Sequence, residues 1–173
     1  SRSGPTEVSQ GEVPGGQCCI LYPMPVYLDL TREFNLGRTR AILSSGQAVV
    51  MHGLALMSKD GDWIVREDAE ATGYILGVLA THSARYRFGA PLDCRWLGGG
   101  WSAHFQYATD GLRIRTDFVT RPPRLDADDL DQMWQDHAEE ELPVLGPRRL
   151  AEIKKTDREK EYPVIGELAR LVG

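Results

Sequence analysis

Two stretches of the sequence decide the fold, and a helical pattern separates them. Residues 40–46 read Arg-Ala-Ile-Leu-Ser-Ser-Gly, a short apolar segment that ends in small residues. Apolar side chains then recur at helical spacing over 47–55, and residues 60–66 read Asp-Gly-Asp-Trp-Ile-Val-Arg, which is typical of a strand. The order predicts a strand, a turn of small residues, a helix over 47–55, and a second strand that begins with two acids.

The chain on either side extends this alternation. A helix is expected over 67–80, with Ile75, Leu76, Val78 and Leu79 on its buried side. Shorter strands are then expected at 85–88, 93–97, 103–107 and 112–119. Further helices are expected at 126–141, from Pro147 to Lys160 and at 164–172. Strand and helix patterns alternate, so the fold class is α/β or α+β.

The N-terminal residues differ in composition from the rest. Residues 1–16 are rich in Ser, Gly and Pro, which predicts a flexible arm followed by a single domain over 17–173. Pro23 and Pro25 interrupt the apolar run over 20–30, where we expect extended backbone. No apolar run approaches the roughly 18 residues of a membrane span, and 1–16 contain no apolar signal segment, so a cytoplasmic location without a membrane partner is expected.

The overall charge limits the possible partners. The chain has 20 Lys and Arg against 25 Asp and Glu, a net charge of −5. Such a molecule has no overall field that would hold nucleic acid non-specifically. A nucleic-acid partner would therefore need a local basic face.

Three acids are the candidate catalytic groups. Asp60 and Asp62 are two residues apart in a predicted strand, so both point to one face, and Asp117 lies in the predicted strand 112–119 on the same face as two arginines. If a neighbouring strand brings Asp117 beside the pair, the three carboxylates suit Mg²⁺, which prefers oxygen ligands. The alternative without a functional site is that residues 59–62 form an exposed turn, because Lys-Asp-Gly-Asp is also a common turn sequence.

A second candidate feature is the small-residue turn that precedes the predicted helix over 47–55. Ser45 and Gly46 would let a phosphate approach the unpaired N–H groups at the start of that helix. The alternative is an ordinary serine cap, which many helices have.

The order of these parts resembles the nucleotidyltransferase superfamily, which has the polymerase-β-like fold, and within it the small bacterial AbiEii-like and minimal nucleotidyltransferase domains. The resemblance covers residues 40–117, and 142–160 are similar to a segment in which such domains carry a lysine and an Arg-Glu-Lys-Asp-like motif. It implies a mixed β-sheet flanked by helices. It also implies metal-dependent transfer of a nucleotide from an NTP to an acceptor hydroxyl on a protein, an RNA end or a small molecule.

The resemblance also implies roles for individual residues. Asp60, Asp62 and Asp117 would be the catalytic acids and would hold Mg²⁺ or Mn²⁺, with Asp117 also acting as the base. The triphosphate would be bound by Ser45, Gly46 and Lys154. The sequence departs from the family pattern at Ser45, where a glycine is usual, at Leu56, where relatives often have arginine, and at Gly61, where an apolar residue is usual. A glycine between the paired acids predicts a loosely held strand.

Two other functions are compatible with the sequence. The first is a catalytically degenerate module of the same fold, an antitoxin-like or regulatory partner of another protein. The second is an interaction domain that uses the acidic helix over 126–141 against a basic partner. We expect no catalytic or metal-binding role for the other candidate residues. The four histidines lack the sequence spacing of zinc ligands, and Cys94 is expected to be structural. Trp63, Trp96 and Trp101 are expected in the core or on a sheet face.

Overall fold

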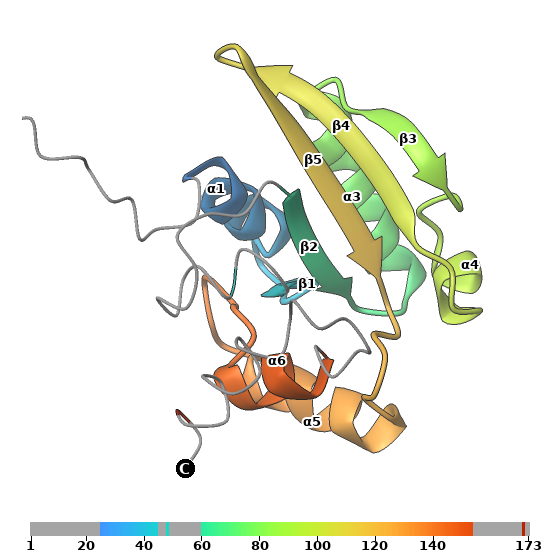
Figure 1. Ribbon diagram of the computed structural model, residues 1–173, viewed down its shortest axis with the longest axis vertical. Helices are drawn as coiled ribbons and strands as arrows, with labels where there is room; N and C mark the ends of the chain where they lie inside the picture. The colour runs from blue at the N-terminus through green and yellow to red at the C-terminus, as the bar shows by residue number, and fades with distance from the viewer. Residues whose placement is uncertain (1–24, 45–47, 49–59, 154–170, 172–173) are drawn as a thin grey trace, which may run out of the picture.

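A computed structural model describes residues 25–44, 48, 60–153 and 171, and shows an α+β fold built on a five-stranded mixed sheet (Figure 1). The strand order is β1-β2-β5-β4-β3. β2 runs parallel to β5, and the other three pairs are antiparallel. The strands are β1 (Ala41–Ser44), β2 (Asp60–Val65), β3 (Arg85–Gly89), β4 (Ala103–Thr109) and β5 (Leu112–Val119).

Local capping explains where several helices begin. The side chain of Asp68 accepts a hydrogen bond from the Ala71 N–H at the start of α3, and Asp126 forms a capping box with Asp129 at the start of α5. The helices are α1 (Pro25–Phe34), α3 (Ala69–Thr81), α4 (Cys94–Gly98), α5 (Ala127–Asp136) and α6 (Pro147–Ile153). No helix in these parts of the chain is long and apolar enough to cross a membrane. Of the helices expected over 47–55 and 164–172, only Ala48 and Leu171 are among the described residues, and both are helical; residues 154–160 of the helix expected from Pro147 lie outside them.

Two apolar clusters cover the two faces of the sheet. Helices α1 and α3 pack on one face, where Trp63 stacks on Phe118 with ring centroids 5.4 Å apart and Phe34 meets Trp63 edge-on at 5.3 Å. On the other face, Ile42 and Ile64 pack with apolar residues of α5 and α6. Because side chains alternate along a strand, the charged residues of β2 and β5 lie on the face opposite α1 and α3.

Gly61 is buried against α1 rather than loosely held. A Cβ at this position would lie 2.5 Å from Tyr27 Cδ1 and 2.6 Å from Trp63 Cη2. The two aromatic rings fill the space that a side chain would otherwise occupy. β2 is also paired on both sides, with β1 and with β5. The close approach of helix and strand therefore requires glycine here, and the expected loosening of the strand is wrong.

Two expected backbone conformations are also wrong. α1 begins at Pro25, where extended backbone is expected from the prolines. Proline is tolerated in the first helical turn because the N–H group that it lacks would have no helical partner there. Residues 94–98 form the short helix α4 instead of a strand, with the Asp93 side chain accepting from the Arg95 N–H as its cap.

Burial also differs from expectation at several apolar side chains. Trp63 is fully buried, but Trp96 and Trp101 are 48% and 57% exposed. On α3, Ile75 and Leu79 are buried as expected, whereas Leu76 is 36% exposed. Helical spacing alone places Leu76 at the edge of the apolar stripe, and the position of α3 on the sheet leaves it facing solvent.

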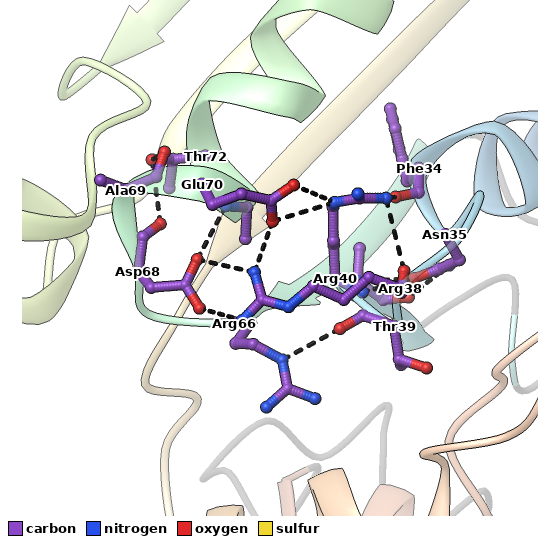
Figure 2. Close-up of polar contacts among 12 residues, drawn as sticks. Phe34, Asn35, Arg38, Thr39, Arg40, Arg66, Asp68, Ala69, Glu70 and Thr72 are labelled. Carbon is purple, nitrogen blue, oxygen red and sulfur yellow. Dashed lines mark hydrogen bonds and ion pairs between the residues drawn. The ribbon is translucent and has the colours of Figure 1, made fainter.

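An arginine network ties the end of α1 to α3 (Figure 2). Arg40 is 8% exposed, and its guanidinium donates to the carbonyls of Phe34 and Leu36 at 3.1 and 2.7 Å and to Glu70 at 2.9 Å. Arg38 pairs with both Asp68 and Glu70. The hydrogen bond from Arg38 is the main cause that holds the pKa of Asp68 below its ordinary value. The network satisfies carbonyls that the end of a helix leaves unpaired, so its role is structural.

Candidate functional site

The three candidate acids share one face of two adjacent strands. The parallel register places Asp62 opposite Asp117 and Asp60 opposite Arg115. Paired residues on neighbouring strands point to the same face and lie about 5 Å apart. Asp60 to Asp62 belong to β2, so the alternative of an exposed turn at 59–62 does not hold for these residues. The metal-binding role of the three acids stays a prediction.

The surface that contains these acids is called the polar face. It is the side of the five-stranded sheet that points away from α1 and α3. The registers arrange it in two rows, of which the first runs Arg85, Gln106, Arg115, Asp60 and the second runs Phe88, His104, Asp117, Asp62, Ser44. Figure 1 shows α3 behind β4 and β5, and no described helix in front of them. The face is acidic on β2 and basic on β3 and on the first half of β5.

Asp117 is held by two groups that act on one of its oxygens. His104 Nδ1 donates to Asp117 Oδ1 at 2.6 Å, and Arg87 Nη1 lies 3.5 Å from the same oxygen. His104 Nε2 lies 2.8 Å from Ser102 Oγ, so both ring nitrogens are engaged. Within the described part of the chain, the other oxygen of Asp117, Oδ2, accepts no hydrogen bond. Asp117 is thus oriented through Oδ1 while Oδ2 stays available.

The three carboxylates act together on a neighbouring group. Burial is the main cause that raises the pKa of the Tyr27 hydroxyl, and the negative charges of Asp60, Asp117 and Asp62 raise it further. A hydrogen bond with the Arg115 backbone opposes these effects. All three negative charges therefore act at the Tyr27 hydroxyl, on the helix that packs against this part of the sheet.

The three acidic side chains are of the chemical type that binds a divalent cation. Three carboxylates on adjacent strands supply the hard oxygen ligands that Mg²⁺ and Mn²⁺ prefer. Over 25–44 and 60–153, no three acidic, histidine or cysteine side chains are gathered closely enough to hold a metal as they stand. Asp117 Oδ1 is instead engaged by His104 of β4 and Arg87 of β3. Asp117 would bind a cation through Oδ2.

Two of the three residues predicted to bind phosphate, Ser45 and Gly46, directly follow β1 in the sequence. Ser45, Gly46 and Lys154 lie outside the described residues. Ser44, which directly precedes Ser45, pairs with Asp62 across β1 and β2, and its hydroxyl donates to the Asp62 carbonyl at 3.3 Å. The last residue of β1 thus lies beside Asp62, and Ser45 and Gly46 follow it in the sequence.

His104 and Arg87 are site residues that the sequence did not reveal. Alternation along 103–107 puts His104 on the face opposite Ala103 and Phe105, but its partner depends on which residue of β5 it opposes. Arg87 reaches Asp117 from a position where the register between β3 and β4 shifts, between Tyr86 and Phe88. Neither the strand register nor the bulge has a local sequence signal.

Comparisons of the chain with protein-family models, with curated proteins and with solved structures found no match. Function must therefore be inferred from the geometry and chemistry of the polar face.

Proposed function

We propose that this chain has a nucleotidyltransferase-like fold and transfers a nucleotide from an NTP to an acceptor hydroxyl in a metal-dependent reaction. One observation carries the proposal: Asp62 opposes Asp117 on the parallel strands β2 and β5, with Asp60 on the same face. The adjoining strand β1 pairs with β2 and leads directly into Ser45 and Gly46. The acids supply oxygen ligands of the kind that a divalent metal prefers, and small residues such as Ser45 and Gly46 would let a phosphate approach the backbone.

Each residue has a defined role in this reaction. Divalent ions bound by Asp60, Asp62 and Asp117 would activate the attacking oxygen and neutralise charge on the leaving group. Asp117 accepts the proton of the acceptor hydroxyl as its oxygen forms a bond to the α-phosphorus, the bond to the β-phosphate oxygen breaks, and pyrophosphate leaves. Ser45, Gly46 and Lys154 bind the triphosphate.

His104 is a positioning residue in this proposal. Its Nδ1 holds Asp117 Oδ1 at 2.6 Å, and its ring is itself fixed by Ser102 and by stacking on Phe88 with centroids 4.2 Å apart. A histidine that hydrogen-bonds to one oxygen of a metal-binding carboxylate fixes the orientation of that carboxylate and leaves its second oxygen for the metal.

The test is nucleotide-dependent stabilisation of the purified chain. Mg²⁺ with ATP at about a hundred times its Kd should add about 2.7 kcal/mol, which raises the melting temperature by roughly 5–10 °C for a chain of this length. Asp62→Asn should abolish the shift. Asp131→Asn, an exposed acid on α5, removes the same charge far from the site and should keep the shift.

Labelled NTP then separates binding from transfer. Asp60→Asn and Asp117→Asn should each abolish label transfer in a cell extract while the proteins stay folded, because asparagine keeps the shape of aspartate and its amide oxygen can still accept the hydrogen bond that His104 donates at position 117. A wild-type protein that binds no nucleotide with either Mg²⁺ or Mn²⁺ would contradict the proposal. That result would favour the non-catalytic binding module, for which the engagement of Asp117 by His104 and Arg87 is the supporting observation.

A further inference from the structure

We propose that the basic part of the polar face binds single-stranded nucleic acid, whose terminal hydroxyl is the acceptor in the reaction proposed above. The inference rests on the proposed function for the reaction but not for the binding. It comes from the juxtaposition of four arginines and an exposed aromatic ring with the acids of β2 and β5.

The arginines form a local basic surface on an acidic chain. β3 contributes Arg85 and Arg87, and β5 contributes Arg113 and Arg115, all on the polar face. Within the described part of the chain, Arg85, Arg113 and Arg115 form no ion pair, and only Arg87 is paired, with Asp117. Arginines without acidic partners are suited to phosphates, which their planar guanidinium groups bind with two hydrogen bonds. Because the whole chain has a net charge of −5, this surface is the local basic face that a nucleic-acid partner needs.

An exposed aromatic ring lies beside these charges. Phe88 is 57% exposed on the polar face, and its ring stacks on His104 with a 24° interplanar angle. Arg87 lies over the same ring, 5.1 Å from its centroid. A positive groove with an aromatic platform is the usual way in which proteins bind single strands, since every base can stack on the ring. An acidic polypeptide would neutralise the arginines but would not explain why a large apolar ring is exposed among them.

The distance across the strands is short enough for one nucleotide to reach from the basic surface to the acids. Phe88 and Asp117 belong to the same row, with His104 between them. Two steps between neighbouring strands span about 10 Å. A terminal nucleotide whose base stacks on Phe88 can therefore place its hydroxyl near Asp117. There the hydroxyl oxygen would bond to the α-phosphorus of the NTP, its proton would pass to Asp117, and pyrophosphate would leave.

Fluorescence anisotropy with a labelled RNA, and with a DNA of the same sequence, each of about 12 nucleotides, tests the binding directly. No metal or NTP is added. The double variant Arg85→Ala/Arg113→Ala should bind about tenfold more weakly at about 0.15 M salt, with a salt slope lower by about 1.4, because two phosphate contacts are lost. Phe88→Ala should weaken binding roughly tenfold. The matched control Arg32→Ala/Arg95→Ala removes two arginines of α1 and α4, helices that pack on the aromatic cluster at the other side of the sheet, and should change little.

Equal effects of the two double variants, or binding of polyglutamate with the same dependence on Arg85 and Arg113, would overturn the inference. Asp62→Asn separates it from the proposed function. That variant should bind the RNA at least as tightly as wild type while it loses the ATP-dependent stabilisation. If the RNA fails to bind but Mg²⁺ with ATP still stabilises the chain, only the acceptor inference is wrong.

Discussion

Replacement of Gly61 by alanine tests how the acid-bearing strand is held. In an ordinary strand this change stabilises a protein by about 0.5–1 kcal/mol, because alanine loses less backbone entropy on folding. Here the added Cβ would lie 2.5 Å from Tyr27 Cδ1 and 2.6 Å from Trp63 Cη2. Carbon atoms in good contact are about 3.5–4.0 Å apart, so the methyl group overlaps each ring by about 1 Å.

The rings have little room to move away. Tyr27 and Trp63 are both 0% exposed, and Trp63 is also fixed by stacking on Phe118 and by a hydrogen bond from its indole N–H to Thr31. Overpacking of a core costs about 1–3 kcal/mol, and two clashing rings place Gly61→Ala at the upper end of that range. After the entropy gain is subtracted, the net loss is about 2 kcal/mol, or roughly 4–8 °C in melting temperature.

Chemical and thermal denaturation of the purified chain measures this loss. Gly73→Ala is the matched control, because Gly73 lies in α3 and a Cβ there meets nothing within 4 Å. That change should stabilise the chain by about 0.5–1 kcal/mol through helix propensity. If Gly61→Ala were as stable as wild type, the packing of α1 against β2 described above would be refuted.

Three further outcomes follow from the network and the site. Arg40→Met should destabilise the chain by about 2–4 kcal/mol in denaturation, since the carbonyls of Phe34 and Leu36 lose their donor; a loss below about 1 kcal/mol would contradict this. Asp68→Asn keeps the helix cap but removes a charge whose pKa lies below its ordinary value, so wild type should be the more stable at neutral pH. The difference in unfolding free energy between wild type and variant should shrink as the pH falls below about 4, and a difference that stays constant with pH would contradict this prediction. Under the proposed function, His104→Ala should weaken Mn²⁺ binding with a nucleotide about tenfold in calorimetry, whereas His104→Asn, which retains a donor near the position of Nδ1, should recover much of it; equal losses would leave His104 without a positioning role.

The sequence determined the elements whose signals are local. The apolar run before Ser44, the acids at the start of β2 and the alternation along β5 each depend on side chains only a few residues apart, so these strands are found where they are expected. The same alternation places Asp117 on the polar side of its strand, away from Phe118. By contrast, a proline or an aspartate does not by itself indicate whether a helix or an extended segment follows. Pro25 begins a helix instead of preventing one, and Asp93 caps α4 where a strand is expected, because each residue suits both conformations.

Only the tertiary structure decided which strands meet and in which register. β2 and β5 are separated along the chain by α3, β3, α4 and β4. They nevertheless lie side by side and run parallel, antiparallel to their outer neighbours β1 and β4, and this pairing brings Asp62 beside Asp117. A shift of one residue would turn Asp117 into the core and Phe118 outward, so burial of the aromatic cluster fixes the register that gathers the acids. His104, Arg87 and the packing around Gly61 depend on the same contacts, because each involves residues far apart in the chain that no local pattern relates.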